Sequence, residues 1–258
     1  MHPIRPKPNQ VITYKSPREL EIMREAGRIV AWTLQELKRS AEPGMTTLDL
    51  DRIAAQCFRQ CGATTAIPKN YNFPGNICVS INDQVVHGIP GPLKIRAGDL
   101  VKVDVAARYQ GYVADATITF GVGKVSPEAE RLMEITYNGM MAGINAARPG
   151  NRLTDIGEAI ERYVRRHGLS VVRQFVGHGV GREMHEPPQV QHVGPGGRGP
   201  VLRPGLCVAI EPQVNLGSPE VRFLDDGWTA VTADGSLSAH FEHTIAVTQN
   251  GPLILTLP

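Results

Sequence analysis

The 258-residue chain is predicted to fold as an α+β domain made of two similar halves, each with two helices followed by strands. An internal repeat with a period near 106 residues is the first observation behind this prediction. The second is that helix start and stop motifs recur at matching places, and the third is that acidic residues recur at matching places in apolar strands. Duplicated halves related by a pseudo-twofold axis would share one curved, antiparallel-rich sheet with helices on its outer face.

The helices are predicted from residues that start and stop them at corresponding positions in the two halves. Serine caps a helix amino terminus, proline suits the first helical position, and glycine or proline ends a helix. The paired markers are Ser16-Pro17 and Ser126-Pro127 at the first starts, Pro43-Gly44 and Pro149-Gly150 at the first ends, and Gly62 and Gly168 at the second ends. The last pair is 106 residues apart, which supports a duplication.

The repeat extends to acidic residues at matching positions in the predicted strands. An apolar strand ends in Asp104 in the first half and in Glu211 in the second half. A later strand carries Asp115 in the first half and Glu242 in the second, where the spacing between the two acids is 31 residues instead of 11. Side chains on a strand alternate between faces, so each acid shares a face with small or polar residues. We expect the four carboxylates to meet on the inner face and the β-branched residues opposite to pack on helices.

Composition excludes several classes of protein. The apolar fraction of 41% and the charged fraction of 20% are those of a globular protein. There is no apolar run of about 18 residues, as a membrane span needs, and the first ten residues contain three prolines and no signal-like segment. A net charge of +2 without long runs of one sign gives no reason to expect nucleic-acid binding. The four cysteines lack the density of a secreted scaffold, so a cytoplasmic protein is expected. We expect a disordered arm over residues 1–12 and a single domain over 13–258.

Four clustered carboxylates need a compensating positive charge, because like charges raise one another's pKa. Lysine or arginine could supply it without any chemistry, or one or two divalent metal ions could do so. Histidine favours the metal, and His178 lies among three glycines with His185 seven residues further on. Glycine permits close approach of the backbone to an ion or a substrate. A Gly-His-Gly is a weak motif alone, and His87, which precedes Gly-Ile-Pro, is by itself typical of a loop.

Together these segments closely resemble type I methionine aminopeptidases, which have the pita-bread fold. The segments that carry the resemblance are residues 80–83 with 87–90, 111–117, 177–181, 209–212 and 238–244. They occur in the family's order within a similarity from about residue 14 to residue 257. The resemblance implies removal of the N-terminal methionine from nascent proteins and peptides by dinuclear metal-assisted hydrolysis, with preference for a small second residue.

The resemblance also implies the ligands of two divalent metal ions. Asp104 would bind the first ion, Asp115 and Glu242 would bridge the pair, and His178 and Glu211 would complete the second. One histidine among four carboxylates permits Co, Mn, Fe(II) or Zn. The ions would activate a water, and Glu211 would carry its proton to the leaving amine.

Two further histidines and an apolar pocket are carried over from the family. His185 would donate to the oxyanion, and His87 to the scissile amide or the leaving nitrogen. The pocket for the methionine side chain would be lined by Phe73, Cys78, Met184 and Trp228. On composition alone Phe73 and Cys78 are equally typical of core packing. Met184 departs from the family, in which an aromatic residue is common there, and the stretch 67–75 also differs.

Two rival functions share the predicted site. A peptidase specific for Xaa-Pro bonds has the same fold and ligands, although such relatives usually carry an extra N-terminal domain that this length would not hold. A non-enzymatic peptide-binding module is the other alternative, against which the presence of all five ligands argues. The expected partners are nascent polypeptide N-termini and, by family implication only, the ribosome exit region, with a monomer as the default.

The remaining histidines are expected to be structural. His243 has the strand parity of the packed face, and three others are expected near turns or at the surface. These three are His167, His192 and His240.

Overall fold

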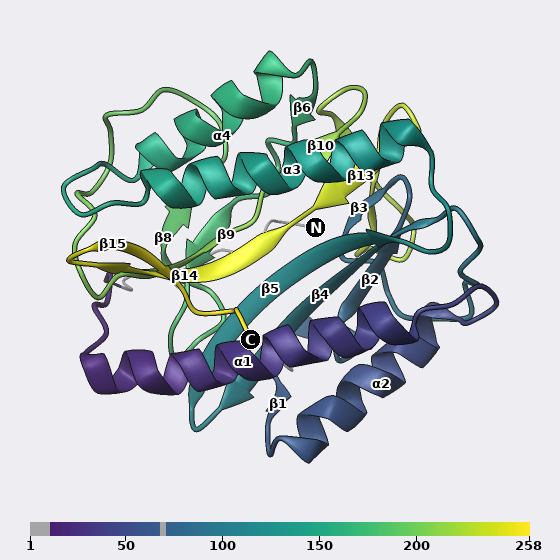
Figure 1. Ribbon diagram of the computed structural model, residues 1–258, viewed down its shortest axis with the longest axis horizontal. Helices are drawn as coiled ribbons and strands as arrows, with labels where there is room; N and C mark the ends of the chain where they lie inside the picture. Colours follow the sequence, from purple (N-terminus) through teal and green to yellow (C-terminus); the bar gives the residue numbers. More distant parts are fainter. Residues whose placement is uncertain (1–10, 68–70) are drawn as a thin grey trace.

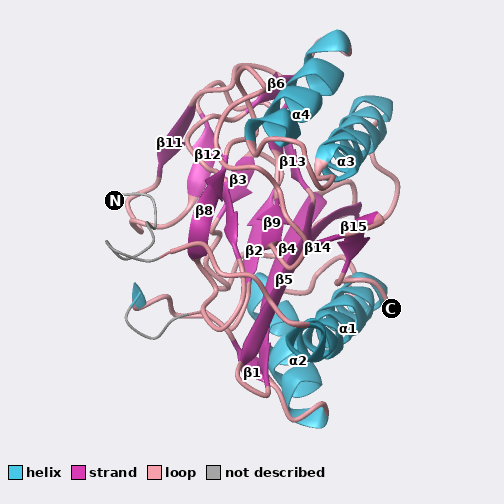
Figure 2. Cartoon of the chain, turned by 90° about the vertical axis from the view of Figure 1, so that its left-hand side faces the viewer, coloured by secondary structure: helices cyan, strands magenta, loops and turns pink. Residues whose placement is uncertain are grey.

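Four helices cover one side of a curved sheet, with one pair from each half of the chain (Figure 1). The computed structural model describes residues 11–67 and 71–258. The helices are α1 (Pro17–Ser40), α2 (Thr47–Gln60), α3 (Pro127–Ala146) and α4 (Thr154–Arg166). Figure 2 shows the four helices on the same side of the strands, so the predicted outer helical layer is confirmed.

The helix boundaries follow from local capping. The Ser16 hydroxyl accepts a hydrogen bond from the backbone N–H of Glu19 at the start of α1, and Ser126 does the same at the start of α3. Gly62 and Gly168, shortly after the ends of α2 and α4, have φ angles of 64° and 76°. This left-handed conformation suits glycine, which has no Cβ. The predicted start and stop residues are therefore confirmed.

A nine-stranded antiparallel sheet joins the two halves. Its main order is β1-β4-β5-β14-β9-β7-β8, with β2 paired to β4 and β15 to β14. The bounds are β1 (Thr64–Thr65), β2 (Cys78–Ile81), β4 (Leu100–Tyr109), β5 (Tyr112–Gly121), β7 (Gly177–Gly179), β8 (Glu186–Val190), β9 (Cys207–Ile210), β14 (Glu242–Thr248) and β15 (Gly251–Ile254). The halves meet where β14 pairs with β5, so residues from both halves lie side by side at this junction.

Two small sheets flank the main one. They contain β13-β10-β6 and β11-β12-β3. The bounds are β3 (Gln84–Val86), β6 (Ser170–Val171), β10 (Gln213–Asn215), β11 (Val221–Phe223), β12 (Ala230–Thr232) and β13 (Ser238–His240). The additional residues of the second half supply β11 and β12, and β12 pairs with β3 of the first half.

Each half has its own apolar core beneath its helices. In the first half, Val101 and Val103 of β4 pack with Leu34 of α1. In the second half, Val208 of β9 packs with Ile144 of α3. Burial of each such side chain contributes about 1.5–3 kcal/mol. The β-branched strand faces therefore meet the helices, as predicted, which leaves the acidic faces on the other side of the sheet.

The predicted disordered arm over residues 1–12 lies mostly outside the described residues. Of its last residues, Ile12 packs against the core of the second half. No helix in the described part of the chain has both the length and the apolar character needed to cross a membrane.

Candidate metal centre

Three carboxylates are brought together by the pairing of β4, β5 and β14. Thr117 of β5 lies opposite both Asp104 on β4 and Glu242 on β14. Its hydroxyl donates to the Glu242 carboxylate at 2.8 Å. Asp115 is two residues from Thr117 on the same strand, and therefore on the same face. The face predicted from strand parity is thus the face on which these acids converge.

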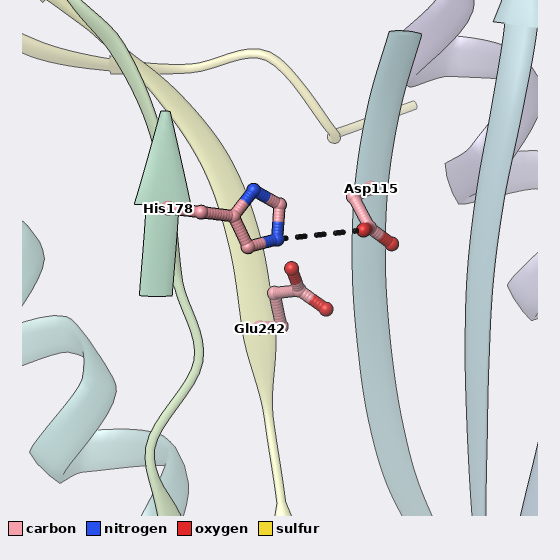
Figure 3. A group of neighbouring side chains, drawn as sticks. All are labelled: Asp115, His178 and Glu242. Atoms are coloured by element: carbon pink, nitrogen blue, oxygen red, sulfur yellow. Dashed lines mark ion pairs between the residues drawn. The ribbon is translucent and has the colours of Figure 1, made fainter. Parts of the chain in front are cut away.

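His178 of β7 and Glu211, which directly follows β9, complete the cluster. The His178 Nε2 atom is 3.4 Å from Glu211 Oε1 and 4.0 Å from Asp115 Oδ2. Figure 3 shows Asp115, His178 and Glu242 pointing toward one another from three strands. One ligand atom from each of these three lies within 4.8 Å of the others. The five side chains expected to bind metal are thereby gathered in one place.

Glycines and a backbone hydrogen bond orient the His178 ring. A Cβ at Gly177 would overlap the carbonyl oxygen of Ala209, and one at Gly179 would overlap that of Pro187. Burial lowers the pKa of His178 to about 4, so the ring is neutral at neutral pH. Its Nδ1 lies 3.0 Å from the Gly179 carbonyl oxygen, which can only accept, so Nδ1 carries the proton. The Nε2 lone pair therefore faces the carboxylates, as a metal ligand requires.

The electrostatics of the cluster demand a cation. Burial raises the pKa of Asp104 to about 6. Burial and the neighbouring carboxylates raise the pKa values of Asp115, Glu211 and Glu242 well above their ordinary range. The buried Oδ1 atom of Asp115 has no hydrogen-bond partner within the described chain. Within residues 11–67 and 71–258, no lysine or arginine forms an ion pair with any of the four acids.

Four carboxylates and one imidazole, with no fixed cation among the described side chains, fit a divalent metal ion. The buried cation on the same strand face as Asp104 is Lys102. Its ammonium donates to the backbone carbonyls of Asn82 at 2.8 Å and Ser238 at 2.9 Å. Burial lowers the pKa of Lys102 to about 7. Lys102 thus holds two backbone segments together rather than neutralising the acids.

An aromatic wall contains three of the residues predicted for the substrate site. The His87 and Trp228 ring centroids are 6.3 Å apart, and those of Phe73 and Trp228 are 5.2 Å apart. His87 has a φ angle of 60°, which is uncommon for a residue with a side chain. Burial lowers the pKa of His87 to about 4. Sequence reasoning missed Phe175, which lies three residues before His178 and whose ring centroid is 5.5 Å from that of His87.

The other predicted residues lie on β2 and on the connection between β7 and β8. Cys78 is opposite Asp104 in the sheet, and burial followed by the nearby acids raises the pKa of its thiol well above the ordinary value. Met184 precedes His185, whose ring centroid is 4.3 Å from that of His178. Burial, more than its histidine neighbours, keeps the pKa of His185 well below its ordinary value.

Tyr71 was also missed by sequence reasoning. Its hydroxyl is 3.3 Å from Nδ1 of His185. A tyrosine hydroxyl that donates to Nδ1 leaves the proton of the neutral ring on Nε2. The stretch 67–75 was identified as unusual, but the sequence carries no indication of this contact.

The expectation of a surface position is wrong for His192 and His240, although His192 does lie in a bend shortly after β8. Their residues are 1% and 3% exposed, because they form a polar layer behind Glu211. His192 Nε2 accepts from the backbone N–H of Glu211 at 3.3 Å. The Gln213 amide nitrogen lies 3.2 Å from His240 Nε2 and 3.3 Å from Glu211 Oε2. His167 does lie at the end of α4, as expected.

The expectation for His243 is confirmed. It extends from β14 toward the opposite face and lies 2.8 Å from the Thr256 hydroxyl through Nδ1. Burial lowers the pKa of His243 to about 4.

Comparison with known proteins gives matches over nearly the whole chain. Metallopeptidase family M24 matches residues 21–249. The chain is 50% identical over 247 residues to methionine aminopeptidase of Clostridium perfringens, with 96% of this chain and 99% of the relative covered. It is 49% identical over 247 residues to methionine aminopeptidase 1 of Bacillus subtilis, with 95% and 99% covered.

Solved structures give the same result. The methionine aminopeptidase of Thermotoga maritima superimposes with a TM-score of 0.94 at 42% identity, covering 96% of this chain and 100% of that one. Prolidase from Pyrococcus furiosus superimposes with a TM-score of 0.75 at 21% identity, covering 95% of this chain and 65% of that one. The second similarity concerns the fold alone.

Proposed function

The chain belongs to metallopeptidase family M24, and we propose that it removes the N-terminal methionine from nascent proteins and peptides, preferring a small second residue. The rival Xaa-Pro specificity has weaker support, because the prolidase compared above is only 21% identical. The observation that carries the proposal is the convergence of acids from both halves on His178, with no fixed cation in the described chain to neutralise them.

The proposed metal ligands are Asp104, Asp115, His178, Glu211 and Glu242, which would hold two divalent ions, Co, Mn, Fe(II) or Zn. The ions would polarise the scissile carbonyl and lower the pKa of an attacking water. The unpartnered Asp115 Oδ1 and the neutral, correctly oriented His178 ring support this assignment. The five residues are buried or half-buried, which strengthens their electrostatic interaction with bound cations.

Glu211 is the proposed proton carrier. Burial and the charges of Asp115 and Asp104 raise the pKa of its carboxyl, which favours taking up a proton. The Gln213 amide nitrogen 3.3 Å from Glu211 Oε2 orients the carboxylate. Glu211 would accept the proton of the attacking water and give it to the leaving amine.

His87 and His185 are the proposed hydrogen-bond donors to the substrate. Both rings are neutral at neutral pH, because burial lowers their pKa values. A neutral imidazole can donate through one nitrogen without introducing a charge into the acidic cluster. His185 would donate to the developing oxyanion, supported by Tyr71, and His87 to the scissile amide or the leaving nitrogen.

The proposed methionine pocket is formed by Phe73, Cys78, Met184 and Trp228. Phe73 and Trp228 contact each other edge to face beside His87, and Cys78 lies opposite Asp104. An apolar slot distinguishes side chains that differ by one methylene by only about 1–3 kcal/mol. We therefore expect norleucine at the first position to be accepted as well.

The decisive experiment compares two classes of peptide. Metal-free protein is loaded in turn with Mn, Fe(II), Co or Zn, and methionine release from Met-Gly-type peptides is measured beside cleavage of Xaa-Pro peptides. We expect methionine release, and its loss in Asp115→Asn and His178→Ala. Preference for Xaa-Pro peptides would replace the proposed substrate, and binding of peptides without cleavage of either class would indicate a binding module.

The proposed setting follows from the proposed substrate. Nascent N-termini would be met in the cytoplasm near the ribosome exit region, by a protein that acts as a monomer. Sedimentation of the purified chain tests the oligomeric state, and co-sedimentation with ribosomes tests the proposed location near the ribosome exit region.

A further inference from the structure

The connection between β7 and β8 carries both Met184 and His185, and it is held from one side by the β4–β5 hairpin. The backbone N–H of Val113 donates to the Gly181 carbonyl at 2.8 Å. The guanidinium of Arg182 lies 4.6 Å from the centroid of the Tyr112 ring. These contacts fix residues 181 and 182 at the beginning of the connection. Different contacts hold its end.

The end of the connection is held by a buried ion pair with the N-terminal segment. Lys15 Nζ is 2.7 Å from Glu186 Oε2, and the two side chains are 4% and 10% exposed. The Thr13 hydroxyl donates to the same oxygen at 2.9 Å. The other carboxylate oxygen of Glu186 accepts from the backbone N–H of Glu183 at 3.1 Å, which closes the turn carrying Met184 and His185.

The surroundings show that the pair is packed tightly in place. A Cβ at Gly181 would lie 2.5 Å from Glu186 Oε1 and 2.6 Å from the Cε atom of Lys15. The backbone N–H of Lys15 donates to the Gly205 carbonyl at 2.7 Å, which holds the backbone of the lysine in place. Burial raises the pKa of Glu186, but the hydrogen bond and charge of Lys15 outweigh it, so the net pKa is lowered.

We propose that Lys15 is a positioning residue for His185, acting through Glu186. Glu186 immediately follows His185, so a shift of its carboxylate moves the histidine backbone directly. Loss of the ammonium would leave a carboxylate buried without a cation, and such a group moves toward water or takes up a proton. Either response releases the turn that holds His185 against His178. The proposal deepens the proposed function, because it rests on the role of His185 as a hydrogen-bond donor to the substrate.

The test uses Lys15→Met, which keeps the length of the side chain and removes its charge. Methionine release from a Met-Gly-type peptide is measured on Mn-loaded protein together with bound Mn per chain. A displacement of about 1 Å can cost on the order of 100-fold in rate. We expect kcat to fall between about 10-fold and 100-fold, KM to change less than about threefold, and bound Mn to stay unchanged. Lys15→Arg should retain most of the rate.

A second readout does not depend on activity. In metal-free protein labelled with ¹⁵N-histidine, the His185 resonances, assigned with His185→Gln, should shift in Lys15→Met and stay near their wild-type positions in Lys15→Arg. The double variant Lys15→Met/Glu186→Gln folds without an unpaired charge, and its kcat should lie between those of Lys15→Met and the wild type. Arg165→Met, which breaks the surface pair with Glu161, is the matched control and should change neither readout.

Two outcomes would overturn the proposal. One is a Lys15→Met or double variant with a lower melting temperature but wild-type kcat and unshifted His185 resonances, which indicates a purely structural pair. The other is an equal loss of kcat in Lys15→Arg and Lys15→Met. A wild-type enzyme that releases no methionine would instead remove the proposed function, and the resonances would still decide whether Lys15 positions His185.

Discussion

Replacing Asp115 by asparagine is predicted to stabilise the metal-free protein while abolishing its stabilisation by metal. The substitution keeps the shape of the side chain and removes one negative charge from the cluster. Little is lost in exchange, because the buried Oδ1 atom of Asp115 has no hydrogen-bond partner in the described structure. We therefore expect repulsion among the clustered acids to lower the stability of the metal-free protein.

The magnitude follows from the distances and from the pKa of Asp104. Two unit charges 4.8 Å apart, the limit for the ligand atoms of Asp115 and Glu242, repel by about 3 kcal/mol at an effective dielectric constant of about 20. Burial raises the pKa of Asp104 from 3.8 to about 6, so ionising it in the folded protein costs about 3 kcal/mol. Both routes therefore give the same order of magnitude for one charge.

The sign of the pH dependence is fixed by the raised pKa values. The folded metal-free protein binds protons on these acids more tightly than the unfolded chain does. For Asp104 the resulting contribution to stability is complete below about pH 4 and is lost as the pH rises through about 6. At pH 8 we expect metal-free Asp115→Asn to exceed the wild type by up to about 3 kcal/mol. That corresponds to about 6 °C in melting temperature at roughly 2 °C per kcal/mol. The difference should shrink at pH 5.

Scanning calorimetry of metal-free and Mn-loaded protein at pH 5 and pH 8 measures these differences. Metal at 100 times its Kd should stabilise the wild type by about 2.7 kcal/mol and the variant far less. Asp51→Asn is the matched control, because Asp51 accepts from the N–H groups of Asn76 at 2.6 Å and 2.7 Å. An amide there leaves buried groups unsatisfied and should destabilise at both pH values. A metal-free Asp115→Asn less stable than the wild type at pH 8 would refute the reasoning.

Three further substitutions separate the parts of the site. His243→Gln, on the helix-covered face, should lower stability by about 1 kcal/mol and leave kcat and bound metal unchanged in the peptide assay. Asp226→Ala removes the carboxylate that accepts from the backbone N–H groups of Trp228 and Thr229 at 2.8 Å, and so loosens the turn that carries Trp228 of the proposed pocket. Steady-state kinetics should then show a KM for a Met-Gly-type peptide that is several-fold higher, with a smaller change in kcat. Lys102→Met deprives two backbone carbonyls of their donor and should cost about 1–3 kcal/mol in urea unfolding.

The parts of the structure that could be predicted are those determined by local pattern. Helix starts depend on a serine and the backbone three residues later, and this holds at both Ser16 and Ser126. The face of each acid depends only on alternation along its own strand, so Asp104, Asp115 and Glu242 could be assigned to the inner face without knowing any partner. The internal repeat supported these predictions, because the helix starts and the acidic strand positions found in one half recurred in the other.

The parts that could not be predicted depend on partners distant in sequence. His192 accepts from the Glu211 backbone 19 residues away, and Gln213 contacts His240 across 27 residues. The sequence around a histidine does not show whether water or a buried amide satisfies its ring nitrogens, so the default expectation of a surface position was wrong for both. The ion pair of Lys15 and Glu186, separated by 171 residues, is a further case.

The site is asymmetric although the fold is duplicated, because corresponding segments of the two halves contribute different residues. Gly179 of β7 lies opposite Val208 of β9, and Ile81 of β2 lies opposite the corresponding Val101 of β4, so His178 corresponds to Ser80 of the first half. The Ser80 hydroxyl accepts from the backbone N–H of Gly88, next to His87. One copy of the strand thus provides a proposed metal ligand, and the other holds the backbone beside a proposed substrate-binding histidine. A symmetric centre with histidine in both copies would close the cluster from both sides, whereas an aminopeptidase must leave one side open for the N-terminal residue of its substrate.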